Sequence, residues 1–396
     1  MRGVLPAFAA ALFFAFASVG ATADTAAEAQ AVNDVLTKSP VPADRFDAAF
    51  LAQVPAAQLT PIRDQVVAPL GQFVRLGGSN GKYTAFYTKG HLTVYITLDA
   101  DGKISGLLLR DPVVTGGSLE EALKPFADLP GSVSYVVLQD GREIAARNQA
   151  QALGVGSTFK LAVLNALRAQ IDAGKRRWTD VVALQHGWKS LPSGVLQAWP
   201  DGAPLTLHTL ATEMISISDN TAADALVHLV GRAAIAPYAG RNDPFMTTHD
   251  MFVLKSRKNA ALLGRYRTGD LAARRDAVSR ADALPLPAIE DLDESPALSD
   301  VEWHYTNREL CKLMAGVHDL DVTRVNPGPA APSQWKRISY KGGSDFGVIS
   351  MTTWVQAKDG RSYCMSASWN NAAAPIDDLK FETLFSTALG TLAGRK

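Results

Sequence analysis

The chain has 396 residues, of which 47% are hydrophobic and 20% are charged, as in ordinary globular proteins, and this excludes a disordered or fibrous chain. Basic and acidic residues both total 39, so no excess of positive charge can neutralise a phosphate backbone, and we expect no nucleic-acid partner. Two cysteines cannot build a disulfide scaffold, and the seven histidines form no H-x-H or H-E-x-x-H pair. The sequence therefore disfavours a zinc hydrolase and implies neither a metal nor an organic cofactor.

The first 23 residues predict a cleavable signal peptide. A basic start at Arg2 precedes an apolar stretch over residues 4–19, and the small residues at 21–23 fit the pattern of a cleavage site. The apolar stretch is shorter than the roughly 20 residues that span a bilayer, so we expect no stable membrane anchor. The mature protein is then expected to begin at Asp24 and to be periplasmic or secreted.

Residues 28–112 are predicted to form a small α+β unit. Residues 24–70 read as helical, because alanine dominates the start and large apolar residues follow at helical spacing. Apolar and polar residues then alternate over 92–98, and a second strand is expected at 104–109 after a turn. Helices followed by antiparallel strands indicate an α+β arrangement, which we expect to end in a linker over 113–125.

The segment from Gly77 to Gly81 fits the pattern G-x-S-x-G, which in some hydrolases carries a nucleophilic serine. That serine requires a strand before it and a helix after it, whereas strands are predicted here on both sides. The dipeptide Asn80-Gly81 is also a strong hairpin signal. We therefore predict a turn without a catalytic role.

Residues 126–396 are predicted to form a second unit, in which strands lie at both ends and helices between them. This order implies one sheet whose edges come from distant segments of the chain, and residues 240–300 are expected to be irregular. Cys311 and Cys364 fall in this unit, and either a disulfide or two separate buried thiols is compatible with the sequence. The predicted helices cover 157–173, 207–216, 221–231, 306–320 and 376–392, and the strands cover 132–138, 143–147, 338–340, 347–355 and 362–369.

The strongest chemical signal is the pattern S-x-x-K formed by Ser157 and Lys160. At the start of a helix, residues three apart share one face, so the lysine amine can reach the serine hydroxyl. A serine becomes a good nucleophile when a neighbouring base takes its proton, and a lysine acts as that base when burial lowers its pKa. By itself the pattern also fits an N-cap serine followed by a solvated lysine.

Two further motifs follow along the chain. Ser218-Asp219-Asn220 lies in a predicted turn between two helices, and Lys341-Gly342-Gly343-Ser344 follows a predicted strand. Together with S-x-x-K they resemble the motifs S-x-x-K, S-D-N and K-[ST]-G of class A β-lactamases and penicillin-binding proteins. Residues 126–396 are thus similar to the β-lactamase-like serine hydrolases, which implies an α+β fold: an antiparallel sheet flanked by helices, with an all-helical lobe.

The resemblance implies a catalytic role for three residues. Ser157 is expected to be the acylated nucleophile, Lys160 its base, and Ser218 the group that relays the proton to the leaving group. We expect Asp219 to cap the helix that follows it.

The resemblance also implies how a substrate is held. Asn220 is expected to bind the amide side chain of the substrate, and Lys341 to supply positive charge for its carboxylate and for the serine at 218. Gly343 and Ser344 are expected to contact the substrate, and the backbone N–H groups of Ser344 and Ser157 to form the oxyanion hole.

Two departures from the family pattern bear on activity. Gly342 stands where the family has a hydroxyl residue that helps bind the β-lactam carboxylate, so either Ser344 replaces that hydroxyl or the substrate differs. The segment E-x-x-L-N, which activates water for deacylation in class A enzymes, is not visible. The acids available in its place are Asp243, Asp250, Glu290, Asp291, Asp293 and Glu294, each of which reads more readily as a solvated loop charge.

The sequence therefore predicts an exported active-site-serine hydrolase that opens a small-molecule β-lactam or a related acyl substrate, with slow deacylation. Two alternatives remain open: an esterase or D-Ala-D-Ala peptidase that uses the same serine and lysine, and a non-catalytic protein that binds cell-wall fragments or an antibiotic. The arrangement of residues 28–112 resembles the small NTF2-like domain found ahead of some such hydrolases, where we expect a packing or partner-binding role. The oligomeric state is not predicted.

Overall fold

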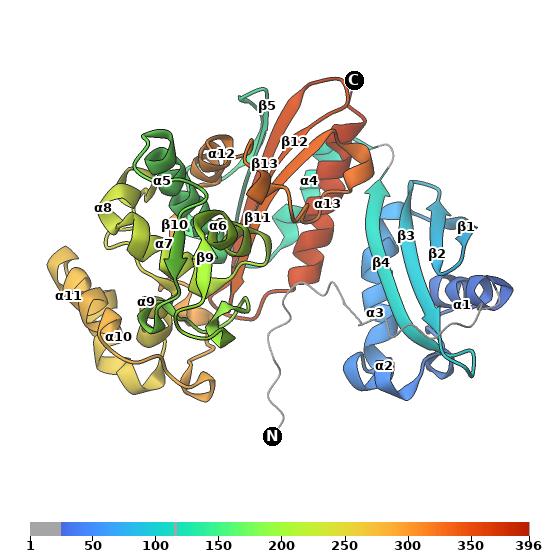
Figure 1. Cartoon of the computed structure of the whole chain (residues 1–396). Coiled ribbons are helices and arrows are strands. Elements are labelled where there is room, and N and C mark those ends of the chain that lie inside the picture. The colour runs from blue at the N-terminus through green and yellow to red at the C-terminus, as the bar shows by residue number, and fades with distance from the viewer. Residues whose placement is uncertain (1–24, 115–116, 396) are drawn as a thin grey trace. The chain divides into compact units, whose positions relative to one another are not determined.

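The structure is a computed structural model that describes residues 25–114 and 117–395 (Figure 1). The predicted signal peptide lies outside these residues. The chain divides into two compact units. The first contains the described residues up to Pro125, together with Pro329–Gln334 and the residues from Asp377 onward, and the second contains Phe126–Gly328 and Trp335–Ile376. The sequence assigned the C-terminal helix to the hydrolase segment, whereas this division groups it with the first unit; the predicted domain boundaries stay a prediction.

The first unit has a four-stranded antiparallel sheet in the order β1-β2-β3-β4. The alternation predicted over 92–98 is present, because Leu92, Val94 and Ile96 of β3 are buried while the residues between them are not. No finding tests the NTF2-like resemblance, which stays a prediction. The elements are α1 (Thr25–Thr37), α2 (Ala48–Gln53), α3 (Ala56–Val67), β1 (Phe73–Ser79), β2 (Lys82–Tyr87), β3 (Gly90–Leu98), β4 (Ile104–Val114), α4 (Leu119–Leu123) and α13 (Asp378–Ala393).

The hairpin predicted at Asn80-Gly81 joins β1 to β2. Ser79 pairs with Lys82, and the two residues between them have φ angles of 54° and 73°. Positive φ at both central positions is what a tight hairpin of this twist requires, and an Asn-Gly pair adopts it easily. The pattern G-x-S-x-G at this place is therefore a turn, as predicted.

The second unit contains a five-stranded antiparallel sheet in the order β11-β12-β13-β5-β6. The strand β5 comes from the start of the unit and pairs with β13 near its end, so Ser134 lies opposite Ser368. The prediction of one sheet built from distant segments is confirmed. The strands are β5 (Ser132–Gln139), β6 (Arg142–Arg147), β11 (Arg337–Asp345), β12 (Val348–Gln356) and β13 (Ser362–Asn370).

Helices form a separate lobe of this unit, drawn mostly in green in Figure 1. The helices α5 (Lys160–Asp172), α6 (Leu207–Ser216) and α7 (Asn220–Val230) pack their apolar faces into one core, to which α12 (Asn307–Ala315) also contributes. The core residues of α5 and α7 are fully buried. The fold is thus α+β, with an antiparallel sheet and a helical lobe, as the sequence predicts.

The expectation that residues 240–300 are irregular is wrong. The segment contains the helices α9 (Thr248–Leu254), α10 (Ala260–Thr268) and α11 (Leu271–Asp282). Local signals explain them: Thr247 and Asp250 form a capping box on α9, and Asp270 caps α11 through the backbone nitrogen of Ala273. Most charged residues of the segment are exposed, whereas Asp250 and Lys255 are buried.

Cys311 of α12 and Cys364 of β13 form a disulfide, which settles the alternative that the sequence left open. Their Cα atoms are 5.9 Å apart, and both side chains are buried beside Val136 of β5. The bond therefore fastens a helix to the middle of the sheet. Over the part of the chain that the structure describes, no helix combines the length and apolarity needed to cross a membrane.

Candidate active site

Ser157 lies in a single 3-10 turn, Gly156–Phe159, which leads directly into α5 at Lys160. The turn is fixed by the two residues that follow the serine. The ring of Phe159 stacks on the indole of Trp303 with 3.7 Å between centroids, and the hydroxyl of Thr158 donates to a backbone oxygen of β12. These contacts bury the neighbours and leave Ser157 itself half-buried at the surface of the turn.

Lys160 is fully buried and donates to acceptors from the S-D-N motif. Its Nζ lies 2.6 Å from the backbone oxygen of Ser218, 2.7 Å from Oδ1 of Asn220 and 3.3 Å from the hydroxyl of Ser218. A neutral amine has two N–H groups, which match the two short contacts and leave its lone pair available. Lys160 can therefore act as a proton acceptor next to the serine turn.

Ser218 is the point at which the three motifs meet. Nζ of Lys341 donates to its hydroxyl at 3.0 Å, so one serine hydroxyl contacts two lysine amines. Ser218 has a φ angle of +61°, which a serine rarely adopts. Ser193 holds this conformation by donating to the backbone oxygen of Ser218 at 2.6 Å. Strained backbone of this kind is more frequent at functional sites.

Burial lowers the pKa of both lysines. The pKa of Lys160 falls to about 7, mainly because burial disfavours the charged amine, although the carboxylates of Asp219 and Asp224 oppose the shift. The pKa of Lys341 is also lowered by burial and by the positive charge of Lys160. Two buried amines with lowered pKa values around one serine are suited to moving protons near neutral pH.

The strand β11 lies directly against the serine turn. A Cβ atom built on Gly343 would overlap the backbone nitrogen of Ser157, and one built on Gly156 would lie 2.8 Å from the backbone nitrogen of Ser344. Only residues without side chains allow this approach. It brings together the two segments whose N–H groups the sequence assigns to the oxyanion hole, those of Ser157 and Ser344.

Asn220 and Asp219 hold the S-D-N turn in place. The amide of Asn220 donates to the backbone oxygen of Leu191 at 2.9 Å. Asp219 is buried and accepts from the backbone nitrogen of Ala222, so its predicted capping of α7 is confirmed. Its second oxygen accepts from two backbone N–H groups at 195–196, a connection that the sequence does not show.

The six acids considered for deacylation are engaged elsewhere or exposed. Asp250 is buried in the cap of α9 and pairs with Arg232, while Asp243 and Asp291 form ion pairs with Arg275 and Lys258. Glu290 and Glu294 are exposed, and Asp293 accepts from the backbone nitrogen of Ser295. Lys160 makes its hydrogen bonds with Ser218 and Asn220 and not with any of these six.

Sequence reasoning missed Asp224, a fully buried carboxyl group on α7. It accepts hydrogen bonds from the backbone nitrogen and hydroxyl of Thr248 and from the backbone nitrogen of His249. Burial nevertheless raises its pKa to about 7. Asp224 is an i+4 neighbour of Asn220 on the helix, but nothing local marks it as buried beside the lysine.

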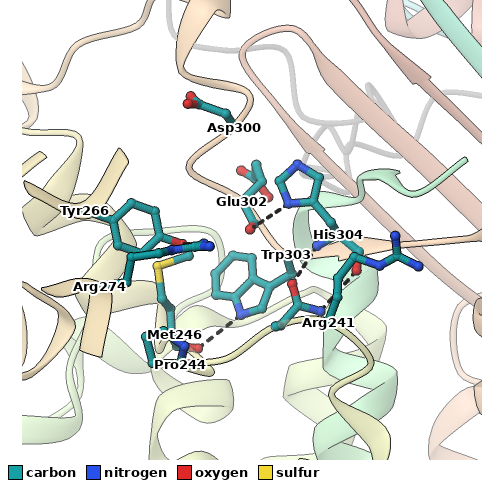
Figure 2. Close-up of a pocket in the computed structure, with 10 residues that line it drawn as sticks. Arg241, Pro244, Met246, Tyr266, Arg274, Asp300, Glu302, Trp303 and His304 are labelled. Atoms are coloured by element: carbon teal, nitrogen blue, oxygen red, sulfur yellow. Dashed lines mark hydrogen bonds between the residues drawn. The ribbon is translucent and has the colours of Figure 1, made fainter. Parts of the chain in front are cut away.

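A cavity of about 340 Å³ is lined in part by Trp303, the residue whose indole stacks on Phe159. Figure 2 shows Tyr266 and Arg274 on one side of the indole, and Arg241 and His304 on the other. The indole nitrogen of Trp303 donates to the backbone oxygen of Met246 at 3.1 Å. None of the motif residues lines this cavity, so it is separate from the lysines and Ser218.

Comparison with known proteins finds one matching family model. Residues 118–258 match the model of a family described as the beta-lactamase enzyme family. This segment is less than half of the chain and contains the S-x-x-K and S-D-N motifs, whereas Lys341 lies beyond it. The predicted resemblance to β-lactamase-type serine hydrolases is thereby confirmed, and the chain is β-lactamase-like in this segment. The search of curated proteins finds no match.

Several solved structures are similar to 70% of this chain. A beta-lactamase from Sphaerobacter thermophilus is 21% identical with a TM-score of 0.48, and 96% of that chain is covered. A beta-lactamase from Chitinophaga pinensis is 17% identical with a TM-score of 0.49 and 98% covered. The structure of PBP-A is 16% identical with a TM-score of 0.47 and 95% covered.

Proposed function

We propose that this chain is an exported serine hydrolase, periplasmic or secreted, that opens β-lactams through an acyl-enzyme on Ser157 and releases the product slowly. The observation that carries the proposal is the position of Ser218, whose hydroxyl contacts the buried amines of Lys160 and Lys341. Each of these residues comes from a different motif. A surface lysine after an N-cap serine has no reason to be buried in this way.

In the first half of the proposed reaction, each of these groups has one role. The neutral amine of Lys160 takes the proton of the Ser157 hydroxyl, whose oxygen attacks the carbonyl carbon of the lactam. The backbone N–H groups of Ser157 and Ser344 stabilise the negative oxygen that forms. The C–N bond then breaks, and the Ser218 hydroxyl gives its proton to the departing nitrogen. The protonated amine of Lys160 returns to Ser218 the proton that it took from Ser157, while Lys341 donates a hydrogen bond to the Ser218 oxygen.

The second half of the reaction requires water to attack the ester on Ser157. A carboxylate normally activates such water, yet the acids considered above are used in caps and ion pairs or are exposed. Asp224 is fully buried, and its oxygens already accept three hydrogen bonds from Thr248 and His249. The proposal therefore includes an acyl-enzyme that persists long enough to be observed.

Time-resolved intact-mass spectrometry with benzylpenicillin tests the proposal. We expect a mass increase equal to one benzylpenicillin, followed by slow return to the free mass. Ser157→Ala removes the nucleophile and should give no adduct. Ser279→Ala removes an exposed hydroxyl from α11 and should be labelled like the wild type. An adduct that persists in Ser157→Ala contradicts the proposed nucleophile, and binding without any adduct favours a non-catalytic protein.

Gly342 favours a second candidate substrate class, because it removes the hydroxyl that the resembling family uses for the β-lactam carboxylate. An ester or a D-Ala-D-Ala peptide is then the acyl donor for the same serine. Turnover of a simple ester without turnover of any β-lactam would support this alternative. Loss of both activities in Ser157→Ala would show that one site serves both.

A further inference from the structure

The cavity lined by Trp303 is assembled from segments other than the three motifs. Its lining comes from the loop at 241–246, from α10 and α11, and from the segment 300–304 (Figure 2). Its volume of about 340 Å³ falls within the range of roughly 300–1,000 Å³ that is usual for small-molecule sites. The cavity is therefore large enough to hold a small organic molecule.

Arg274 of α11 brings a buried donor without a partner to this cavity. Its guanidinium carbon lies 4.8 Å from the centroid of the Tyr266 ring, and its Nη2 donates to the Tyr266 hydroxyl at 3.2 Å, so the group is held in one orientation. Its Nε is buried and has no hydrogen-bond partner among the residues that the structure describes. A buried N–H group without an acceptor is destabilising, and an acceptor bound in the cavity would satisfy it.

A second guanidinium, that of Arg241, also lines the cavity. Within the described ranges Arg274 makes no ion pair, and Arg241 has 3.8 Å between its Nη2 and the nearest oxygen of Glu309, which is too long for a hydrogen bond. Burial is the main cause that lowers the pKa of His304, and the positive charges of both arginines lower it further, against the charge of Asp300. Both cations therefore act on the interior of this cavity.

The two acids in the lining are already matched by other basic residues. Asp300 pairs with Arg267 at 2.6 Å, and Glu302 accepts from Nζ of Lys255 at 3.2 Å. Burial also raises the pKa of Glu302, which favours its uncharged form. The lining therefore has positive charge available and little negative charge to repel an anion.

The remaining lining is largely flat and apolar. The rings of Tyr266 and Trp303 are buried, and Pro244 and Met246 also line the cavity. The indole is held in place because its N–H group donates to the backbone oxygen of Met246 at 3.1 Å. Aromatic walls favour a ligand with a flat ring, and a guanidinium is a planar donor that matches a carboxylate.

We propose that this cavity is a binding site for a small aromatic carboxylate, separate from the serine site. The carboxylate accepts a hydrogen bond from Nε of Arg274, and Arg241 adds positive charge. The ring of the ligand lies against Tyr266 and Trp303. The inference uses none of the residues assigned to the reaction on Ser157, so it does not depend on the proposed function.

Isothermal titration calorimetry with 2-naphthoate and 2-naphthamide tests the proposal, because the two probes share a ring system and differ in charge. We expect one 2-naphthoate to bind per chain, at least about tenfold more tightly than 2-naphthamide, since hydrogen bonds to ionised groups are about twice as strong as neutral ones. Arg274→Gln should weaken the binding of 2-naphthoate by about tenfold and that of 2-naphthamide by less than about threefold. Arg241→Gln changes an exposed side chain and should also weaken only the anion.

Two further variants are the controls. Arg280 lies on the same helix as Arg274, but it is exposed and pairs with Asp276, so Arg280→Gln should leave the affinity for 2-naphthoate unchanged. Lys341→Gln removes a cation from the serine site and should also leave it unchanged. Thermal melting of each variant shows whether it is folded, and Arg241→Gln decides the question if Arg274→Gln is not.

The inference is overturned if 2-naphthoate does not bind at concentrations up to about 10 mM, or if the two probes bind equally well. Unchanged affinity in the folded arginine variants of the cavity would mean that the probe binds elsewhere. Loss of binding in Lys341→Gln would place the probe at the serine site and would also overturn it. None of these results bears on whether Ser157 is acylated.

Discussion

At the scale of single residues, the site depends on two lysines that are buried because of what surrounds them. Lys160 is held by acceptors from Ser218 and Asn220, and none of these contacts is local in sequence. Burial disfavours its positive charge, so that the amine is largely neutral above a pH of about 7. The same side chain on an open helix surface would stay protonated and could not accept a proton.

This gives a prediction for the pH dependence of acylation. Because the folded pKa of Lys160 is about 7, the neutral amine is scarce below that pH and dominant above it. The acylation rate of the wild type should therefore rise with pH through about 7 and then level off. Stopped intact-mass measurements over a pH series check this.

Lys160→Arg is the matched control, since a guanidinium keeps its charge at every pH of the series. This variant should be acylated slowly, with no rise near pH 7. A wild-type rate that is the same on both sides of pH 7 would show that another group takes the proton from Ser157.

At the scale of elements, the N-terminus of α7 contains two residues of the S-D-N motif, Asp219 and Asn220. Asp219 caps this helix and also accepts from two N–H groups of the loop at 195–196. We predict that Asp219→Ala lowers the free energy of unfolding by at least about 2 kcal/mol, because it removes a cap and leaves buried N–H groups unsatisfied. Chemical denaturation measures this change.

Asp270→Ala is the control for the cap alone. Asp270 caps α11 in the same way, but it is exposed and makes no second connection to a loop. Its loss should cost only about 1 kcal/mol. Equal effects of the two substitutions would mean that the loop connection of Asp219 contributes little.

At the scale of the whole molecule, the disulfide joins α12 of the helical lobe to the central part of the sheet. Cys311 and Cys364 are 53 residues apart, and closing a loop of this length restricts the unfolded chain. Cys311→Ala with Cys364→Ala should lower the free energy of unfolding by about 4 kcal/mol. Ser157 is not in contact with the bond, so acylation below the melting temperature should be nearly unchanged.

Denaturation with and without reductant checks this prediction in the wild type. Reduction should lower the denaturation midpoint of the wild type and leave that of the double cysteine variant unchanged. A midpoint that does not respond to reductant would mean that the cysteines are thiols in the folded protein.

Much of the fold follows from local patterns. The strands β5, β6, β12 and β13 and the helices α5, α6 and α7 lie where alternation and helical spacing place them. The helices α9 to α11 were missed because their charged residues obscured the capping signals at Thr247 and Asp270. Caps are short local patterns, so these helices could have been predicted from the sequence.

By itself, the sequence indicated which side chains form the candidate site, because the motifs at Ser157, Ser218 and Lys341 are short and each folds into a local turn or strand. Only the tertiary structure decided that these motifs meet, that the two cysteines pair, and that Arg241 and Arg274 line one cavity. The physical reason is that these contacts join distant segments: the two cysteines are 53 residues apart, Lys160 and Ser218 are 58 apart, and Ser218 and Lys341 are 123 apart. Burial by these distant segments lowers the pKa values of the two lysines, and no local sequence pattern predicts it.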